Sequence, residues 1–147
     1  MFLPQRPYLM PGTLREQLMY PQPDGQSNEA DLRAVLEAVN LSEVLDRVDG
    51  NWEARVDWAN ILSLGEQQRL SFARLLLKRP RLAFLDEATS ALDEPNEQRL
   101  YEHLRNSGTA YVSVGHRSSL RKFHQRLMVL KRDGSWRLSL LKPGGEQ

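Results

Sequence analysis

Two adjacent carboxylates, Asp86 and Glu87, follow a short apolar run that extends from Leu82 to Leu85. An unbroken apolar run of this length is typical of a strand that is buried on both faces of a parallel sheet. Ligands of such sheets bind beyond the carboxyl ends of the strands. We therefore expect Asp86 to hold a metal ion through its waters and Glu87 to orient or deprotonate a water. A strand that ends in a solvated acidic turn would show the same pattern, so the rest of the chain must decide.

The segment from Ser63 to Glu66 is a second candidate. Its spacing fits a capping box, in which Ser63 and Glu66 each accept the backbone N–H of the other at the start of a helix. The exposed amides of such a helix start, with Gly65 among them, can bind an anion. An ordinary capping box explains Ser63 and Glu66, but it does not explain Gly65 together with the polar run at 67–69.

Two more polar residues fall near the same predicted edge. His116 directly follows the β-rich segment 110–114, which places it at the carboxyl edge of the sheet. A lone histidine is also often an ordinary surface residue, as we expect for His103 and His124. Asp93 adds a carboxylate shortly after the acidic pair, where helix capping is an equally natural role.

Composition sets the limits of these hypotheses. The chain has 147 residues, with 20 Lys and Arg against 19 Asp and Glu, and its net charge of +1 gives no global field for nucleic acid. The absence of cysteine excludes disulfides and thiolate metal sites. No apolar run approaches the roughly 20 residues that span a bilayer, and the first residues do not form a secretory signal. We expect one soluble globular domain.

The elements that must position the candidate residues follow from periodicity and turn signals. Strands are expected at 1–3, 82–85 and 110–114, and a hairpin at 127–131 and 136–141. Helices are expected from Thr13 to about 19, from 27 or 28 to about 39, from Ser42 to about Gly50, from Ser63 to 79, from Pro95 to about 108 and, with basic character, from about 118 to 123. The segment 21–27 and the tail from Pro143 are expected to be loops. Strand, helix and strand over 80–115 predict an α/β chain with a parallel sheet, preceded by a helical block.

The order and spacing of these candidates resemble the nucleotide-binding domain of ABC ATPases over residues 2 to about 130. On this resemblance, Gln5 matches the glutamine loop, Ser63, Gly65 and Gln67 the signature, Asp86 and Glu87 the Walker B motif, Asp93 the D-loop and His116 the switch histidine. The signature departs from the commonest form at Leu64 and Glu66, which replace a glycine and a glutamine. Together with Trp58 and the opening Phe2–Tyr8, it looks like the branch of peroxisomal fatty-acyl transporters and their bacterial relatives, in which membrane and nucleotide domains share one chain.

The resemblance implies a partial P-loop NTPase fold in one domain, 1–147. Its parts would be the glutamine loop at about 1–12, a helical subdomain with the signature helix at about 13–79, and the Walker B motif, D-loop, switch histidine and C-terminal hairpin at about 80–147. ATP and Mg2+ would lie between two such domains arranged head to tail, at the cytoplasmic face of a membrane. Gln5 would sense the magnesium that Asp86 holds, Glu87 would be the general base, His116 would contact the γ-phosphate, Ser63 and Gly65 would bind the nucleotide of the opposite subunit, and Asp93 would link the two sites.

One part of the family pattern is missing from the sequence. Phosphoryl transfer in this family also needs a glycine-rich loop, G-x-x-x-x-G-K-[ST], and none of the nine glycines is followed by lysine. We therefore expect a truncated, split or partial gene product that binds ATP poorly and hydrolyses none by itself. We also expect the strand at 82–85 to lack its flanking strands, which would leave an apolar edge exposed.

Three other functions compete with transport-linked hydrolysis. The chain could be a catalytically incompetent remnant that binds and regulates an intact subunit, or a soluble ABC ATPase that acts outside transport. The branch-like signature and the lack of a coiled-coil insert argue against the soluble ATPase. A third reading rests on four basic residues around 117–126, but such a group is usually a solvated face, and we expect no nucleic-acid partner.

Overall fold

The computed structural model of the chain describes residues 1–21 and 27–141. The chain forms two compact units, Met1–Val114 and Gly115–Gln147. Most of the loop predicted at 21–27, and the whole of the loop predicted from Pro143, lie outside the described residues. The single domain over 1–147 stays a prediction.

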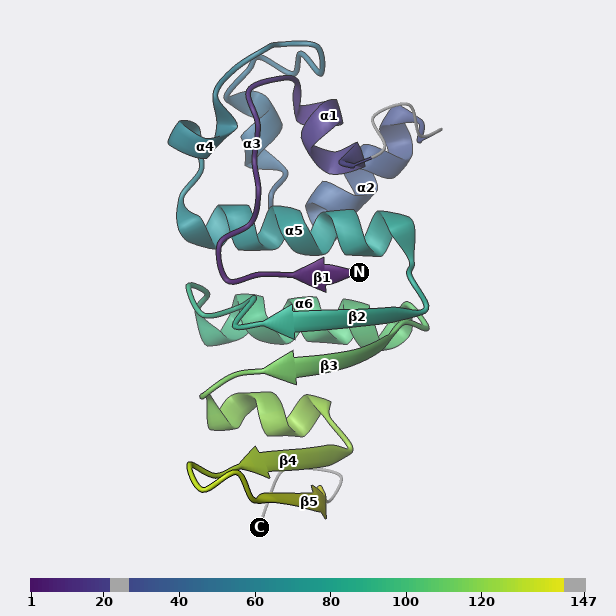
Figure 1. Cartoon of the computed structure of the whole chain (residues 1–147). Coiled ribbons are helices and arrows are strands. Elements are labelled where there is room, and N and C mark those ends of the chain that lie inside the picture. The colour runs from purple at the N-terminus through teal and green to yellow at the C-terminus, as the bar shows by residue number, and fades with distance from the viewer. Residues whose placement is uncertain (22–26, 142–147) are drawn as a thin grey trace. The chain divides into compact units, whose positions relative to one another are not determined.

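The first unit combines a parallel sheet with helices. Its strands are β1 (Phe2–Leu3), β2 (Leu82–Asp86) and β3 (Ala110–Val114), and its helices are α1 (Leu14–Met19), α2 (Glu29–Ala38), α3 (Glu43–Asp46), α4 (Trp58–Ile61), α5 (Leu64–Lys78) and α6 (Glu94–Asn106). β2 is central and pairs in parallel with β1 on one side and β3 on the other (Figure 1). The predicted α/β class with a parallel sheet is confirmed.

The side chains of this sheet alternate between a covered face and an open face. Ala83 and Leu85 of β2 lie on the covered face and are at most 1% exposed. Helix α6 packs there, where the Tyr101 ring lies 5.8 Å from the ring of Tyr111 in β3. The open face carries apolar side chains that are 41% to 60% exposed, namely Phe2, Leu82, Phe84, Val112 and Val114.

Two expectations for the strand at 82–85 are therefore wrong. The strand is buried on one face only, because the unbroken apolar run hides which of its faces is covered. It also does not lack neighbours, since β1 and β3 flank it. What this arrangement leaves exposed is an apolar face of the sheet.

Local capping signals explain where the main helices begin. Thr13 and Ser63 form the predicted capping boxes of α1 and α5. Asp93 caps α6, with Pro95 in the first turn as predicted. Ser42, in contrast, makes no capping hydrogen bond, and its helix α3 is a single short turn rather than a helix that reaches Gly50.

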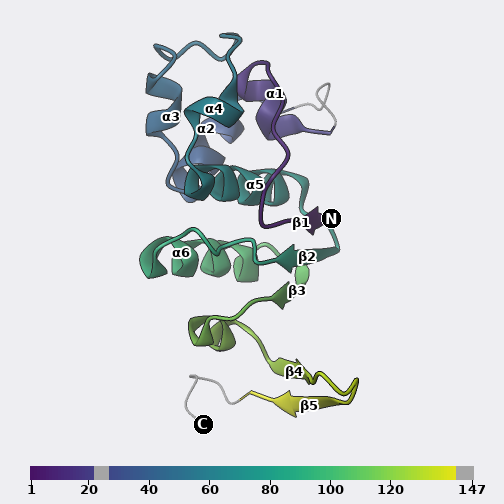
Figure 2. The same ribbon diagram turned by 60° about the vertical axis from the view of Figure 1, so that its left-hand side comes forward.

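A helical block, α1 to α4, packs against α5 on the side away from the sheet (Figures 1 and 2). Its anchor is Trp58, which is fully buried and donates its indole N–H to the Gly12 carbonyl oxygen at 2.9 Å. Gly12 immediately precedes the cap of α1, and α4, which Trp58 starts, ends just before the cap of α5. One side chain thus ties the starts of two helices together.

The second unit contains a short 3-10 helix, η1 (Ser118–Phe123), and an antiparallel hairpin formed by β4 (Arg126–Leu130) and β5 (Trp136–Leu140). The predicted hairpin is confirmed, with Gly134 in the left-handed conformation at its turn. The basic segment predicted as a helix is the 3-10 helix, which buries Leu120 and Phe123. Among the described residues of the chain, no helix has the length and apolar content needed to cross a membrane.

Candidate functional site

Gln5 and Glu87 meet at the carboxyl edge of the sheet. Gln5 lies two residues beyond β1, and Glu87 directly follows β2. The Gln5 side-chain amide donates to Glu87 Oε2 at 3.0 Å and to the Ser90 hydroxyl oxygen at 3.3 Å. Neighbouring parallel strands end at the same edge, which explains why residues so distant in sequence lie together. The structure thus brings together two of the predicted site residues.

The two adjacent carboxylates leave the strand in different backbone conformations. Asp86 is the last residue of β2, and it is exposed. Glu87 has φ +48°, in the left-handed region that residues other than glycine rarely adopt. Its N–H donates to the Val114 carbonyl oxygen at 2.9 Å, so pairing with the neighbouring strand holds the turn in place.

The predicted signature begins with a complete capping box. The Ser63 hydroxyl oxygen accepts the Glu66 N–H at 3.2 Å, and Glu66 Oε2 accepts the Ser63 N–H at 2.8 Å. Burial alone would raise the pKa of Glu66, but hydrogen bonds from Arg47 and Ser63 and the charge of Arg47 outweigh it, and the pKa is lowered. The hydroxyl hydrogen of Ser63 is not used by this cap, so it can still be donated to an anion.

Gly65 is the point where the signature touches the D-loop. A Cβ atom at this position would lie 3.1 Å from the Ala91 carbonyl oxygen and 3.4 Å from a methyl group of Leu92. A side chain here would therefore push the loop away from α5. This contact is the physical reason for a glycine that a capping box does not require.

Gln67, the third predicted signature residue, is turned back toward the preceding turn. Its side-chain amide donates to the carbonyl oxygens of Leu62 at 3.0 Å and Ala59 at 3.2 Å. These bonds support the backbone that leads into the signature. Binding of a nucleotide by Gln67 stays a prediction.

Asp93 has the capping role that its position also allowed. It accepts the Asn96 N–H at 3.0 Å and the Asn96 side-chain amide at 2.8 Å. These hydrogen bonds, first that from the backbone, lower the pKa of Asp93. Asn96 in turn accepts the side-chain amide of Asn40 at 3.0 Å, which connects the D-loop to the end of α2.

His116 lies in the second unit, two residues beyond the end of β3 along the chain, and it is exposed. Its approach to the edge of the sheet stays a prediction. The other two histidines are half-buried, and a ring nitrogen of His124 lies 2.8 Å from the Leu120 carbonyl oxygen.

Sequence reasoning included Gln68 in the polar run at 67–69 but assigned it no role of its own. This residue of α5 is fully buried, and its side chain contacts Gln5, Ser90 and Ala91. The only hint in the sequence is a second amide directly after Gln67, within the polar run at 67–69. No local pattern names the partners of such a residue, because they lie in distant loops.

The residues at the edge fit a magnesium ion that is shared with a substrate. The described ranges contain no group of three or more His, Cys, Asp or Glu side chains that could hold a metal ion. Magnesium at phosphate sites uses one or two carboxylates together with phosphate oxygens and waters. The exposed carboxylate of Asp86 offers a single ligand of this kind.

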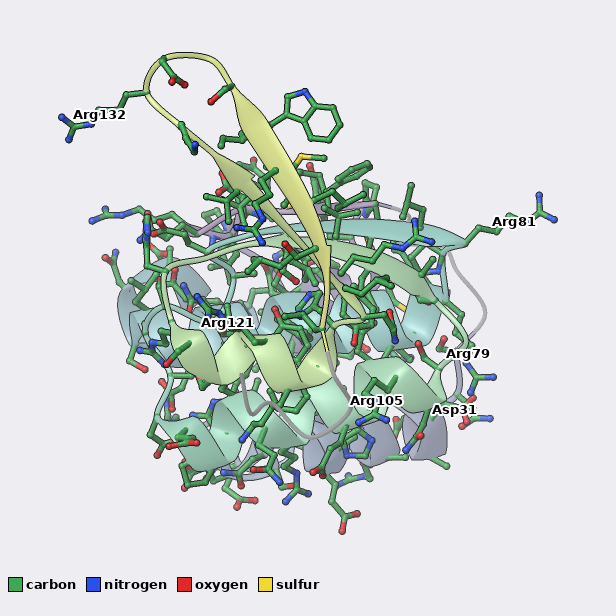
Figure 3. The ribbon with its side chains drawn as sticks, turned by 90° about the horizontal axis from the view of Figure 1, so that it is seen from below. Asp31, Arg79, Arg81, Arg105, Arg121 and Arg132 are labelled. Atoms are coloured by element: carbon green, nitrogen blue, oxygen red, sulfur yellow. The ribbon has the colours of Figure 1, made fainter. Side chains whose placement is uncertain are left out.

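A cavity of about 530 Å³ lies elsewhere, between α2, α5 and α6. Asp31, Arg79 and His103 are among its lining residues, and none of the predicted site residues is. Figure 3 shows Arg79 and Arg81 extending outward at the turn between α5 and β2. This turn precedes β2, whereas the carboxylates follow it, so the cavity is distinct from the candidate site.

Comparison with known proteins gives a consistent family. A family model described as ABC transporter matches residues 1–90. An ABC transporter ATP-binding protein of Synechocystis sp. is 47% identical over 95% of this chain and 21% of its own length. The lysosomal cobalamin transporter ABCD4 of Mus musculus is 46% identical over 97% of this chain and 24% of its own length. ABC transporter D family member 2, chloroplastic, of Arabidopsis thaliana is 43% identical over 88% of this chain and 22% of its own length.

Among solved structures, a bacterial Atm1-family ABC exporter with ATP bound is similar, with a TM-score of 0.74 at 29% identity over 88% of this chain and 23% of that chain. The chain therefore spans less than a quarter of the length of these relatives. Bacterial and D-family proteins stand together among them, as the signature predicted. The chain belongs to the ABC transporter ATP-binding family, in the branch that holds the D-family transporters and their bacterial relatives.

Proposed function

We propose that this chain supplies the catalytic carboxylate and the signature of the ATP-hydrolysing site of an ABC transporter. The observation that carries the proposal is the hydrogen bond between the Gln5 side chain and Glu87 Oε2 at the carboxyl edge of the sheet. It joins a glutamine and a carboxylate from two neighbouring strands at the place where α/β sheets bind ligands.

Glu87 is the general base of the proposed reaction. Its carboxylate takes a proton from a water as the water oxygen bonds to the γ-phosphorus of ATP, and the bond to the β–γ bridging oxygen breaks to leave ADP and phosphate. Gln5 donates to one carboxylate oxygen and so fixes the orientation of the base.

Asp86 would hold the magnesium ion, and Gln5 would sense it. When bound, magnesium neutralises the charge that develops on the phosphate oxygens. Asp86 is exposed at the end of β2 and is free of the backbone turn that Glu87 makes. Its place at the edge supports a metal-holding role that is separate from the role of the base.

The signature residues would act on the nucleotide of a second, head-to-tail domain. The Ser63 hydroxyl and the amides around Gly65 lie at the start of α5, a helix long enough for its N-terminus to favour an anion. Gln67 supports this segment and would complete the signature. Asp93 would link the two sites of the pair, and His116 would orient the γ-phosphate.

The open face of the sheet is a surface on which a further polypeptide segment could pack. Apolar side chains such as Phe84 and Val112 are close to half exposed there, and an exposed apolar patch marks a place for another surface. The sequence contains no G-x-x-x-x-G-K-[ST] loop. A segment that carries this loop would complete the phosphate site, and the chain by itself would hydrolyse no ATP.

Transport is the process that the relatives favour. Their names are those of transporters and of transporter ATP-binding proteins, which argues against a soluble ATPase outside transport. We place the chain at the cytoplasmic face of a membrane, with the Gln5 loop and the helical subdomain at about 13–79 against a membrane domain. The part at about 80–147 then carries the hydrolytic residues within one nucleotide-binding domain.

The test is magnesium-dependent ATP hydrolysis by the purified chain, alone and mixed with a separately produced polypeptide from an ABC transporter relative that carries the glycine-rich loop. We call the second component the complementing polypeptide. We expect no turnover by the chain alone and turnover in the mixture. Glu87→Gln should lower the rate at least about 100-fold, the usual contribution of a general base. Glu102→Gln, a matched change of an exposed carboxylate on α6, should leave the rate unchanged.

Two results would contradict this proposal. Turnover by the chain alone that Glu87→Gln abolishes would mean that the phosphate site is built from residues of this chain. A mixture that binds tightly but hydrolyses nothing would favour the competing function, a regulatory module without catalysis.

A further inference from the structure

Gln68 is a fully buried amide between two loops of the candidate site, the one that holds Gln5 and the one at 87–93 between β2 and α6. Its side-chain nitrogen donates to the Gln5 carbonyl oxygen at 2.8 Å and to the Ser90 hydroxyl oxygen at 3.1 Å, and it lies 3.5 Å from the Glu87 carbonyl oxygen. Its side-chain oxygen accepts the Ala91 N–H at 3.0 Å. The side chain is 0% exposed, so water does not compete for these bonds.

The partners fix the orientation of this amide. A backbone carbonyl can only accept and a backbone N–H can only donate, so the nitrogen must face Gln5 and the oxygen must face Ala91. The side chain at this position must therefore offer a donor and an acceptor at the same time, as the amide of glutamine does. Leucine would leave the Ala91 N–H without this acceptor, and glutamate would place a carboxylate against the carbonyl oxygen of Gln5.

Two residues on the same face of α5 contact the backbone of Ala91. Gly65 and Gln68 are three residues apart and therefore neighbours on the helix surface. Gly65 lies against the Ala91 carbonyl oxygen, while Gln68 accepts the Ala91 N–H. The D-loop is thus fixed to the helix that starts at the signature.

We infer that Gln68 is a positioning residue that keeps Gln5 within reach of Glu87. It holds the backbone of Gln5 directly, and it shares the Ser90 hydroxyl oxygen with the Gln5 side chain. Gln68 touches neither ATP nor water in the proposed reaction, so its loss changes the rate of the chemical step rather than nucleotide binding. This inference rests on the proposed function of the Gln5–Glu87 pair.

Gln17 offers a matched control in the helical block. It is also 0% exposed, and it too bonds a backbone carbonyl oxygen and a backbone N–H, both of Met10, at 2.8 Å and 3.3 Å. Gln68→Leu and Gln17→Leu therefore remove the same kind of buried amide, one that bonds to loops of the candidate site and one that bonds to Met10.

The first measurement is hydrolysis by the chain mixed with the complementing polypeptide. We expect Gln68→Leu to lower kcat by about 10-fold to 100-fold, the size of effect that a misplacement of about 1 Å produces. KM for ATP should stay within about 2-fold, in keeping with a lost transition-state interaction. Gln17→Leu should leave kcat within about 2-fold of wild type. An unchanged kcat in Gln68→Leu, or an equal loss in Gln17→Leu, would overturn the inference.

The second measurement is amide hydrogen exchange in the purified chain, which needs no activity. Gln68→Leu should speed exchange at Ala91 about 10-fold or more, whereas Gln17→Leu should speed exchange at Met10 and not at Ala91. Gln68→Glu keeps the acceptor for Ala91, so it should preserve protection there while kcat falls; it also serves if Gln68→Leu does not fold. Unchanged exchange at Ala91 in Gln68→Leu would overturn the inference. If the wild-type mixture hydrolyses no ATP, the proposed function fails, and the exchange result alone decides whether Gln68 holds the loop.

Discussion

Two helices of the first unit, α1 and α5, begin with the same capping chemistry and differ in the distant contacts that each helix makes. At α1 the Thr13 hydroxyl oxygen accepts the Glu16 N–H at 3.0 Å, and Glu16 accepts the Thr13 N–H at 2.7 Å. At α5 the corresponding distances for Ser63 and Glu66 are 3.2 Å and 2.8 Å. The two helix starts are therefore indistinguishable in their local bonds.

The buried glutamines that follow the two caps separate them. Gln17 bonds to Met10, seven residues away in sequence, and so completes a local structure. Gln68 bonds to loops that lie 22 to 63 residues away. A cap by itself marks where a helix starts; only contacts with distant loops distinguish a structural helix start from a candidate site.

The largest loss of stability is expected from a substitution that removes the side chain shared by the two helix starts. Trp58 is fully buried and bonds to Gly12 beside the first cap, while its own helix leads into the second. Trp58→Ala should lower the free energy of unfolding by about 3–5 kcal/mol, measured by urea titration. The matched change Trp136→Ala, at a tryptophan that is 63% exposed, should stay within about 0.5 kcal/mol. A loss below about 1 kcal/mol for Trp58→Ala would show that the two starts do not depend on this anchor.

The next effect tests whether the two caps differ in function. Thr13→Ala and Ser63→Ala should each lower the free energy of unfolding by about 1 kcal/mol, since each removes one capping acceptor. Only Ser63→Ala should also lower ATP hydrolysis in the mixture with the complementing polypeptide, because only this hydroxyl is proposed to reach a phosphate. Equal losses of hydrolysis in both variants would mean that the effect comes from stability alone.

The smallest effect concerns the acidic members of the caps. The lowered pKa of Glu66 means that its contribution to stability is present above about pH 4.5, the ordinary value, and is lost as the pH falls through the lower pKa of the folded chain. The difference in unfolding free energy between wild type and Glu66→Gln should therefore be constant near neutral pH and should shrink below pH 4.5. Urea titrations from pH 3 to 7 would measure it.

Glu29→Gln is the control for this comparison. Glu29 pairs with Arg15 at 3.6 Å, but its side chain is 57% exposed, so its removal should give little difference at any pH. A difference between wild type and Glu66→Gln that grows as the pH falls would contradict the assigned direction of the pKa shift.

Local patterns predicted much of the fold. The starts of α1, α5 and α6 were predicted, because capping depends on residues three positions apart, and the parallel sheet followed from the order of its elements. The covered face of β2 was not predicted. An unbroken run such as Leu82–Leu85 is compatible with burial on one face or on two, and the layers around a strand decide which.

In the candidate site, too, local patterns predicted some residues, and contacts between distant segments determine the others. Asp86, Glu87 and Ser63 stand in recognisable patterns, whereas the partners of Gln68 and the Arg47 side chain that binds Glu66 lie 19 or more residues away in sequence. Such pairs form only when the chain has folded, and no periodicity marks them. The left-handed backbone at Glu87 was equally invisible, because a glutamate gives no sign of it.

That backbone conformation sets folding and chemistry against each other at one position. A left-handed residue other than glycine costs on the order of 1 kcal/mol, so asparagine or glycine would suit position 87 better than glutamate as far as the fold is concerned. Selection for stability alone would therefore favour replacement of Glu87, the proposed general base. A laboratory screen of variants of this chain for thermal stability should enrich Glu87→Asn or Glu87→Gly. The selected variants would be more stable, but they would lack the proposed general base.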